Sequence, residues 1–423
     1  MDKLAFSSLL IGLLAGLQPI SVEVSPEVHA ATLEIVLDGS VLAHLTKPPW
    51  TTSVDLGSEL KPHVIAALAL DTRGHEVGRV ARELNVPHGP AQVDILVQRD
   101  RLDRPIAAKL VATSVLRDSP LERTLTFDGA ALLLDGNAQA ALPPFDASQT
   151  HILTGVARFP NDVEARADLA LGGVVTESSG ARLTAIALRV PDSGAKTNTS
   201  SVSFMASGIA TKPALIEKGS ATVLIVRDPR STEASRKLNR IPDFQSRLDP
   251  GDRAGFIWPV SKNPADGVER ADLLDSSPLF AANQGGFLWL LTRVSRPGRA
   301  PTPPFHFADA VAVAGLQAAG YGTRRAVVFV EGDEQSDDSH FSPAQVIPYL
   351  RSLGVPLHVW SLRGSAPSAW SASPEDIHSI VGLQKAFRTL REDLEHQRIA
   401  WLTGKWLPGQ VAISGRSGME LLR

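Results

Sequence analysis

The first half of the chain contains one series of motifs twice, and this repeat limits what the chain can fold into. The first copy consists of Leu37-Asp38-Gly39, Pro48-Pro49-Trp50 and a segment that begins at His63. The second copy has the same order: Leu134-Asp135-Gly136, Pro143-Pro144-Phe145 and a segment that begins at His151. Because a repeated series of motifs marks a repeated structural unit, the sequence predicts two similar modules, residues 17–97 and residues 98–191.

Each copy has the pattern of a small antiparallel β-sandwich. A strand-like run ends in Asp-Gly, a dipeptide that favours a tight hairpin turn. Proline lacks the backbone N–H donor, so Pro48-Pro49 is expected at a sheet edge. Short strands at this spacing are typical of sandwiches, and the repeat resembles the immunoglobulin-like modules of bacterial cell-envelope proteins. We expect His63 and His151 to pack or to form hydrogen bonds rather than to bind a ligand.

The pattern changes after residue 191. Residues 192–215 begin with a small, polar run and are expected to form a linker. From residue 216 to residue 423, apolar runs alternate with helical stretches, which predicts a doubly wound α/β domain with a parallel sheet. The expected strands are Ala221–Val226, Ala254–Trp258, Gly286–Leu291, Ala326–Val330 and Leu357–Leu362. The expected helices are Ser231–Leu248, Phe307–Ala319, Pro343–Leu353 and Glu375–Arg391.

Composition excludes several functions. The chain has 42 basic and 45 acidic residues, and this net charge of -3 makes a nucleic-acid partner improbable. It contains 0 cysteines, so disulfides, thiolate metal sites and cysteine nucleophiles are excluded. Any metal must bind oxygen or imidazole ligands, which favours hard cations such as magnesium.

Ligands of doubly wound sheets bind beyond the carboxyl ends of the strands, and three loops are expected there. The first is Arg227–Thr232, the second contains Thr302, and the third is Glu331–Ser339. His306 and His340 lie close to these loops in the sequence, as candidates for ligating or for recognising a partner. We interpret the acidic residues of the third loop, including Asp333, as a solvated turn rather than a calcium loop.

The segment Ala326–Leu362, AVVFVEGDEQSDDSHFSPAQVIPYLRSLGVPLHVWSL, resembles the von Willebrand factor type A domain. The resemblance runs from about Thr222 to Arg423. Leu248–Gly255 matches the turn into the second strand of that family, and Arg398–Trp401 with Gly418–Leu422 resembles the closing segment of a bacterial subgroup. That subgroup often carries immunoglobulin-like repeats ahead of the α/β domain, which fits the two modules expected in the first half of this chain.

The resemblance implies a metal ion-dependent adhesion site, which uses an Asp-x-Ser-x-Ser loop, a threonine and a third-loop aspartate to hold magnesium or manganese. The corresponding residues of this chain are Asp228, Thr232, Thr302 and Glu331, but Arg230 stands where the first serine belongs. A guanidinium cannot ligate a cation and can instead pair with the acids, so we expect a degenerate site without metal. The alternative is a magnesium site formed by these four residues.

The N-terminal stretch Leu4–Leu17 carries no charge and is shorter than a membrane span, so residues 1–16 are expected to be an export signal. The protein would then be extracytoplasmic. If this segment is instead a strand of the first module, the protein would be cytoplasmic. No other stretch has the pattern of a transmembrane span.

These features favour a noncatalytic binding, scaffolding or adhesion protein with a protein partner and no cofactor. We expect the partner to contact Arg230, Trp258, His306 and Asp333. Two alternatives remain: magnesium-dependent adhesion, and a hydrolase with an unrecognised site around Asp228, His306 and Glu331.

Overall fold

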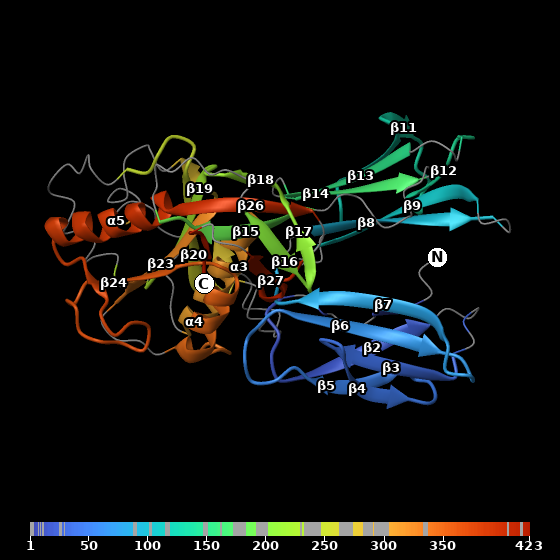
Figure 1. Ribbon diagram of the computed structural model, residues 1–423, viewed down its shortest axis with the longest axis horizontal. Coiled ribbons are helices and arrows are strands. Elements are labelled where there is room, and N and C mark those ends of the chain that lie inside the picture. The colour runs from blue at the N-terminus through green and yellow to red at the C-terminus, as the bar shows by residue number, and fades with distance from the viewer. Residues whose placement is uncertain are drawn as a thin grey trace.

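The computed structural model describes most of the chain. Outside the described residues lie 1–3, 7, 9, 11, 25–27, 29, 88–90, 101–103, 115–118, 147–150, 161–162, 172–182, 192–201, 229–230, 232–246, 262–273, 282–290, 292–303, 333–336, 404–405 and 415–417. Figure 1 shows two β-sandwiches at one end of an elongated molecule and an α/β domain at the other, with further strands between them.

Module 1 is a sandwich of a three-stranded and a four-stranded sheet, with orders β1-β2-β5 and β4-β3-β6-β7. Apolar side chains that alternate along β3 and β6 point between the sheets and form one core with those of β1 and β2. The strands are β1 Leu4–Phe6, β2 Leu17–Val24, β3 Thr32–Leu37, β4 Ser40–Leu45, β5 Thr51–Asp55, β6 His63–Leu70 and β7 Glu76–Leu84.

The start of the chain belongs to this core. Strand β1 pairs with β2, with Leu4 opposite Val24, and Leu10 is buried in the same cluster. Module 1 therefore begins before residue 17, which differs from the predicted boundary. Residues 4–6 form a strand, which is the alternative to an export signal stated above. Export therefore stays a prediction. None of the helices formed by the described residues is both long and apolar enough to cross a membrane.

Module 2 is a second sandwich, with sheets ordered β12-β9-β8 and β11-β10-β13-β14 around its own core. Its strands are β8 Ala91–Arg99, β9 Pro105–Ser114, β10 Glu122–Phe127, β11 Ala130–Leu132, β12 Gln139–Ala141, β13 His151–Phe159 and β14 Val163–Leu171.

The two modules repeat one Asp-Gly hairpin, but the equivalent of Asp38 is Asp128 rather than the predicted Asp135. Asp38 and Asp128 have φ angles of 50° and 49°, and the glycines after them have 86° and 81°, as a type I′ turn requires. Nδ1 of His63 lies 2.7 Å from Oδ2 of Asp38, and Nδ1 of His151 lies 2.7 Å from Oδ2 of Asp128. These histidines therefore fix hairpins, which confirms their predicted hydrogen-bonding role.

A third sandwich, module 3, is built from two segments far apart in the chain. Its sheets are ordered β18-β26-β15-β28 and β17-β16-β27, with one core between them. Ser207 and Gly208 form the same kind of turn, with φ angles of 47° and 82°. The strands are β15 Leu183–Arg189, β16 Ser203–Ala206, β17 Ile209–Thr211, β18 Pro213–Glu217, β26 Gln397–Thr403, β27 Val411–Ser414 and β28 Glu420–Leu421.

Module 3 corrects the predicted linker and the boundary of the α/β domain. Residues 203–217, mostly inside the expected linker 192–215, form strands, and β26, β27 and β28 complete their sheets rather than the α/β domain. The α/β domain is inserted between β18 and β26. The pairing of β15 with β26 spans about half the chain, so no local pattern predicts it.

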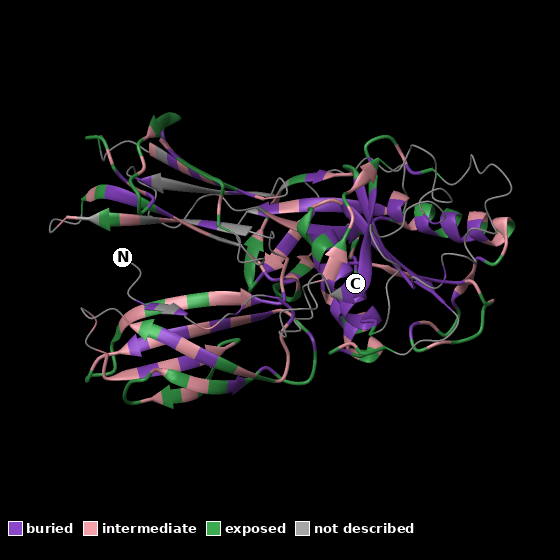
Figure 2. Cartoon of the chain, turned by 180° about the vertical axis from the view of Figure 1, so that it is seen from behind, coloured by how far each residue is buried: buried purple, intermediate pink, exposed green. Residues whose placement is uncertain are grey.

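The α/β domain has a central sheet ordered β21-β20-β19-β23-β24-β25, with β22 beside β20. Strands β20, β19, β23, β24 and β25 are parallel neighbours, and β21 is antiparallel. All residues of β19 and β23 are buried, as expected for strands covered on both faces (Figure 2). The strands are β19 Ala221–Arg227, β20 Arg253–Ser261, β21 Leu274–Ser276, β22 Phe280–Ala281, β23 Arg324–Glu331, β24 Leu357–Ser361 and β25 Glu375–Asp376.

Three helices cover this sheet: α3 Phe307–Gly320, α4 Pro343–Ser352 and α5 Ile380–Glu395. Helices α3 and α4 begin where the sequence predicts. Helix α5 begins later than the predicted Glu375, because Glu375–Asp376 pair with β24 and Ser379 Oγ caps the helix by accepting from the Gly382 N–H at 3.1 Å. The expected helix 231–248 lies almost wholly outside the described residues, and so does the expected strand 286–291, of which only Leu291 is described, as helical.

Module 1 is joined to the α/β domain through Asn85. Its side chain accepts from the Leu14 N–H and donates to the Leu14 and Lys61 carbonyls, and its main-chain carbonyl accepts from the Tyr349 hydroxyl on α4 at 3.0 Å.

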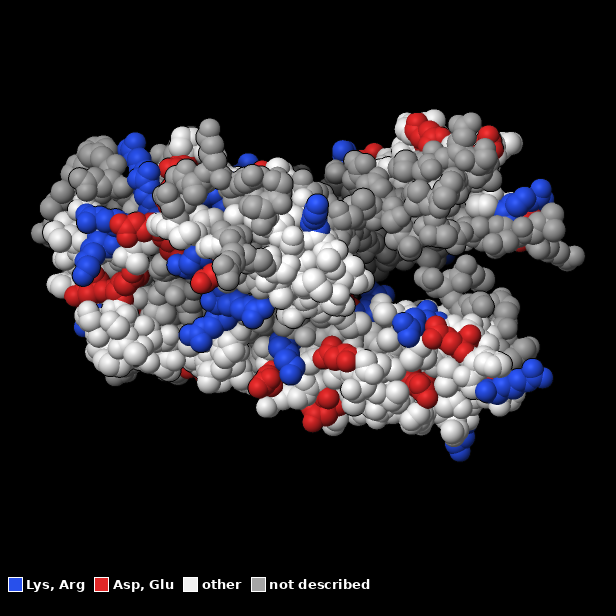
Figure 3. Space-filling view, in the orientation of Figure 1, with Lys and Arg blue, Asp and Glu red and all other residues white. Residues whose placement is uncertain are grey.

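Figure 3 shows acidic and basic side chains interspersed on the face drawn.

Candidate functional site

The strand order places a candidate site at one edge of the parallel sheet. With the short strand β22 left aside, the strands stand in the order third, second, first, fourth, fifth and sixth, which is the order of doubly wound sheets, although the third, β21, is antiparallel. The connections that follow β19 and β23 lead to strands on opposite sides, β20 and β24, and a doubly wound sheet with this arrangement is expected to bind a ligand beyond the carboxyl ends of those two strands. Asp228 follows β19, and Glu331 is the last residue of β23.

Asp228 is closed off from solvent, with 0% exposure. Its N–H donates to the Val330 carbonyl at 3.2 Å, and its own carbonyl accepts from the Ser231 N–H and hydroxyl at 2.9 and 2.6 Å. Its carboxylate lies against Gly332: a Cβ there would come within 2.0 Å of Oδ2. A side chain at position 332 would therefore displace the Asp228 carboxylate, and Asp228 joins the loops after the two central strands.

Glu331 is also buried, and its partners lie in the loop after β24. Burial raises the pKa of the Glu331 carboxyl, while a hydrogen bond with Ser368 and the charge of Arg363 partly offset that rise. The acid that the resemblance assigns to a metal is thus engaged by a serine and an arginine.

The adhesion site that the resemblance implies is only partly described, so both its degenerate form and the magnesium alternative stay predictions. Among the described residues, the one group of three metal-ligating side chains within 4.8 Å of one another includes neither Asp228 nor Glu331. Arg230, Thr232, Thr302 and Asp333 lie outside the described residues, so their predicted roles remain predictions.

Trp258 does not have its predicted role in binding a partner. It is 1% exposed inside the sheet, stacks on Phe256 with 5.1 Å between ring centroids, and lies 5.5 Å from the guanidinium carbon of Arg227. An aromatic residue on a central strand packs in the core, even near the end of that strand.

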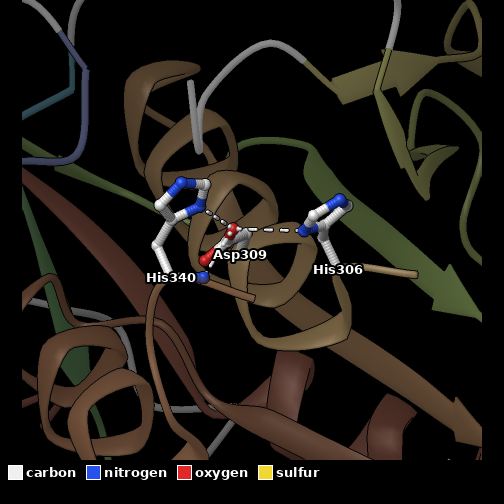
Figure 4. Close-up of side chains that lie close together, drawn as sticks. All are labelled: His306, Asp309 and His340. Atoms are coloured by element: carbon white, nitrogen blue, oxygen red, sulfur yellow. Dashed lines mark hydrogen bonds and ion pairs between the residues drawn. The ribbon is translucent and has the colours of Figure 1, made fainter. Parts of the chain in front are cut away.

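The group that does converge is His306, Asp309 and His340, at the start of α3 (Figure 4). His306 is the N-cap residue of α3, and Asp309 lies one turn further along, so a spacing of three residues places both on one side of the helix. His340 comes from the loop between β23 and α4. Its Nδ1 lies 2.9 Å from Asp309 Oδ2, and Nδ1 of His306 lies 3.9 Å from the same oxygen.

The loop that carries His340 is bound to the start of α3 by its own side chains. Asp337 accepts from the N–H groups of Phe307 and Ala308 at 2.9 and 3.1 Å, and the Ser339 hydroxyl accepts from the Asp309 N–H at 3.1 Å. These bonds satisfy N–H groups that a helix start leaves without partners, so loop and helix form one unit.

Sequence reasoning named His306 and His340 but missed Asp309. Acidic residues are common in the first turn of a helix, where they stabilise the macrodipole, so Asp309 alone indicates nothing. The available signal was His-x-x-Asp across a helix start. Its convergence with His340, 31 residues after Asp309, requires the tertiary fold.

Comparisons with known proteins add little to this geometry. No family model matches the chain. No curated protein matches it either. Solved structures that it resembles are modules of the fibronectin-III or immunoglobulin kind.

Three solved structures illustrate this likeness. The fibronectin(III)-like modules of Clostridium thermocellum CbhA are 12% identical, with 42% of this chain and 98% of that chain covered and a TM-score of 0.17. The central fibronectin-III array of RIM-binding protein is 10% identical, with 49% and 77% covered and a TM-score of 0.24. A 1.5-MDa bacterial ice-binding adhesin is 11% identical, with 47% and 76% covered and a TM-score of 0.15. These TM-scores are too low to carry an argument, so the fold rests on the strand pairing.

Proposed function

We propose that this chain is a noncatalytic, extracytoplasmic binding protein whose α/β domain, of the von Willebrand factor A type, binds a protein partner at the carboxyl edge of its sheet. The observation that carries the proposal is the strand order, which supports a ligand crevice between β19 and β23. Sequence resemblance over the same domain supports the family, and the proposed location rests on the apolar N-terminal stretch.

The two acids of this crevice support binding without a catalytic or magnesium centre. Asp228 is packed against Gly332, and Glu331 interacts with Ser368 and Arg363. Both carboxylates therefore stabilise the loops around the crevice. The partner is therefore bound by the exposed part of the third loop, which includes Asp338 and His340.

The surrounding modules support a role in presenting this surface. The α/β domain is attached to module 3 by both of its ends, and ion pairs reinforce that attachment: Arg189 with Asp393 at 2.5 Å, and Lys218 with Glu395 at 2.8 Å. The Asn85 junction connects it to module 1 as well. A domain held at several points keeps its binding edge in a fixed orientation, which lowers the entropy lost on binding.

Charge reversal at opposite edges of the sheet tests the proposal. Asp338 is exposed at the carboxyl edge of the sheet. Glu392 is exposed near the end of α5. That end of α5 lies at the opposite edge, because the Leu394 carbonyl accepts from Arg324, the first residue of β23. Immobilised full-length protein is incubated with a cell-envelope extract, and the proteins retained are identified by mass spectrometry.

We expect wild type and Glu392→Lys to retain the same proteins, and Asp338→Lys to lose at least one of them by about tenfold or more, as for a charge inside an interface. Equal retention by both variants, or no protein retained by wild type, would contradict the proposal. Release of the same proteins by a chelator, with recovery on adding Mg²⁺, would favour the metal-dependent alternative.

A further inference from the structure

We propose that His306, Asp309 and His340 bind one divalent transition-metal ion of the zinc class. Each side chain offers one ligand atom, and these atoms lie within 4.8 Å of one another. The site is separate from the acids that the adhesion-site resemblance implies, and it stands whether or not the proposed partner exists.

The separations fit a shared ion. Zinc binds histidine nitrogen and carboxylate oxygen at about 2.0–2.2 Å, so two ligands at a tetrahedral angle are about 3.4 Å apart. Nδ1 of His340 and Nδ1 of His306 lie 2.9 and 3.9 Å from Asp309 Oδ2, one slightly shorter and one slightly longer than that value. His340, with 44% of its side chain exposed, can move by the few tenths of an ångström required.

The second observation is the state of His306. Its side chain is 7% exposed, and its Nδ1 makes no hydrogen bond to any residue that the structure describes. Burying a polar atom without a partner costs free energy, and such an atom calls for a specific explanation. Figure 4 shows this nitrogen facing Asp309, where a metal ion would supply the missing partner.

The surroundings of Asp309 are those of a metal ligand held in place. Its Oδ1 accepts from the Phe341 N–H at 3.2 Å and its Oδ2 from the His340 N–H at 3.1 Å, so the carboxylate is oriented by backbone donors. A helix start normally repels cations, but the Asp337 carboxylate lies on the first N–H groups of α3 and offsets that dipole.

The donor set selects the ion. Two imidazoles with one carboxylate suit zinc and its neighbours, whereas magnesium and calcium prefer oxygen ligands. Binding replaces the contact between His340 Nδ1 and Asp309 Oδ2, because a histidine nitrogen ligates a metal through its lone pair. Three protein ligands leave a fourth position for water or a partner's donor atom.

The test uses full-length protein freed of metal with a chelator and then titrated with Zn²⁺ alone by calorimetry. Co²⁺ serves as a second probe, because its visible absorption reports imidazole ligation directly. The test variant is His340→Ala, whose exposed side chain lies outside the core. The matched control is His378→Ala. His378 is also exposed, and its Nδ1 lies 2.6 Å from Asp376 Oδ1, but among the described residues this pair belongs to no group of three metal-ligating side chains.

We expect wild type and His378→Ala to bind one Zn²⁺ with equal affinity and to give the same Co²⁺ spectrum. His340→Ala is expected to bind Zn²⁺ at least about tenfold more weakly and to lose that spectrum. Mg²⁺ in about hundredfold excess should not compete. Absence of Zn²⁺ binding, equal binding by His340→Ala and wild type, or displacement by Mg²⁺ would overturn the proposal.

Discussion

The part of module 1 that contacts the α/β domain should depend on the side chain of Asn85, which ties the segments around Leu14 and Lys61 together beneath that contact. Asn85 is 2% exposed and has a φ angle of 57°, a left-handed conformation that asparagine tolerates and alanine resists. Its side chain makes three hydrogen bonds to backbone groups, at 2.7, 2.7 and 2.8 Å. Asn85→Ala removes these bonds and adds backbone strain.

The magnitude follows from these contacts. Three lost hydrogen bonds at about 1 kcal/mol each, with about 1 kcal/mol for alanine at positive φ, give a loss of about 4 kcal/mol. Asn85→Gly removes the bonds but not the favourable backbone geometry, so it should cost about 3 kcal/mol. Asn137, exposed in a turn of module 2, is the control, and Asn137→Ala should change nothing measurable.

Native-state hydrogen exchange read by mass spectrometry measures this loss locally, which suits a chain of several domains. A loss of about 4 kcal/mol corresponds to about a thousandfold faster exchange through opening of the segments that Asn85 joins, around residues 14, 61 and 85. A change below about tenfold for Asn85→Ala would refute the reasoning, since water would then replace the side chain without cost.

Three further predictions follow from described contacts. Burial would lower the pKa of His358, but the hydrogen bond with Asp393 and the nearby Glu375 carboxylate outweigh burial and raise that pKa to about 9 from 6.5. The resulting stabilisation, about 3 kcal/mol, is present below pH 6.5 and is lost as the pH rises through about 9, so unfolding by urea should show this slope in wild type but not in His358→Gln. Gly332→Ala should lower the melting temperature, because the alanine Cβ would meet the Asp228 carboxylate. The double variant with Asp228→Ala should recover part of that loss. An unchanged melting temperature in the single variant would show that the loop adapts. Deleting residues 1–16 removes four buried apolar side chains, those of Leu4, Phe6, Leu10 and Leu13, and should cost on the order of 6 kcal/mol of stability. Hydrogen exchange in β2 should therefore accelerate. Unchanged exchange would identify residues 1–16 as a dispensable leader.

The sequence predicts the centre of the α/β domain well because its strands are buried on both faces. Continuous apolar runs such as Ala221–Val226 can lie only in such strands or in a buried helix, and flanking turns decide between these. Of the run Gly286–Leu291 only Leu291 is described, so the strand expected there stays a prediction.

Features that depend on distant pairing could not be predicted. Two Asp-Gly turns lie close together in module 2, and only the contact of His151 with Asp128 identifies the one equivalent to Asp38. Module 3 depends on pairs such as Leu188 with Leu421, which no local pattern indicates.

The candidate site was predictable in its place but not in its chemistry. Beyond the strand ends, the sequence indicates Asp228 and Glu331, and the structure places both there. Burial and neighbouring loops then decide what each acid does, and neither property is visible in a motif. His306 and His340 lie close to the same aspartate only because Asp337 binds the loop that carries His340 to the start of α3.

Anomalous X-ray scattering from crystals soaked separately in Zn²⁺ and Mn²⁺ tests most directly where this domain binds a cation. The account predicts a Zn²⁺ peak among His306, Asp309 and His340, and no Mn²⁺ peak beside Asp228 and Glu331. A Mn²⁺ ion ligated by Asp228 and Glu331, with nothing bound between the two histidines, would contradict it.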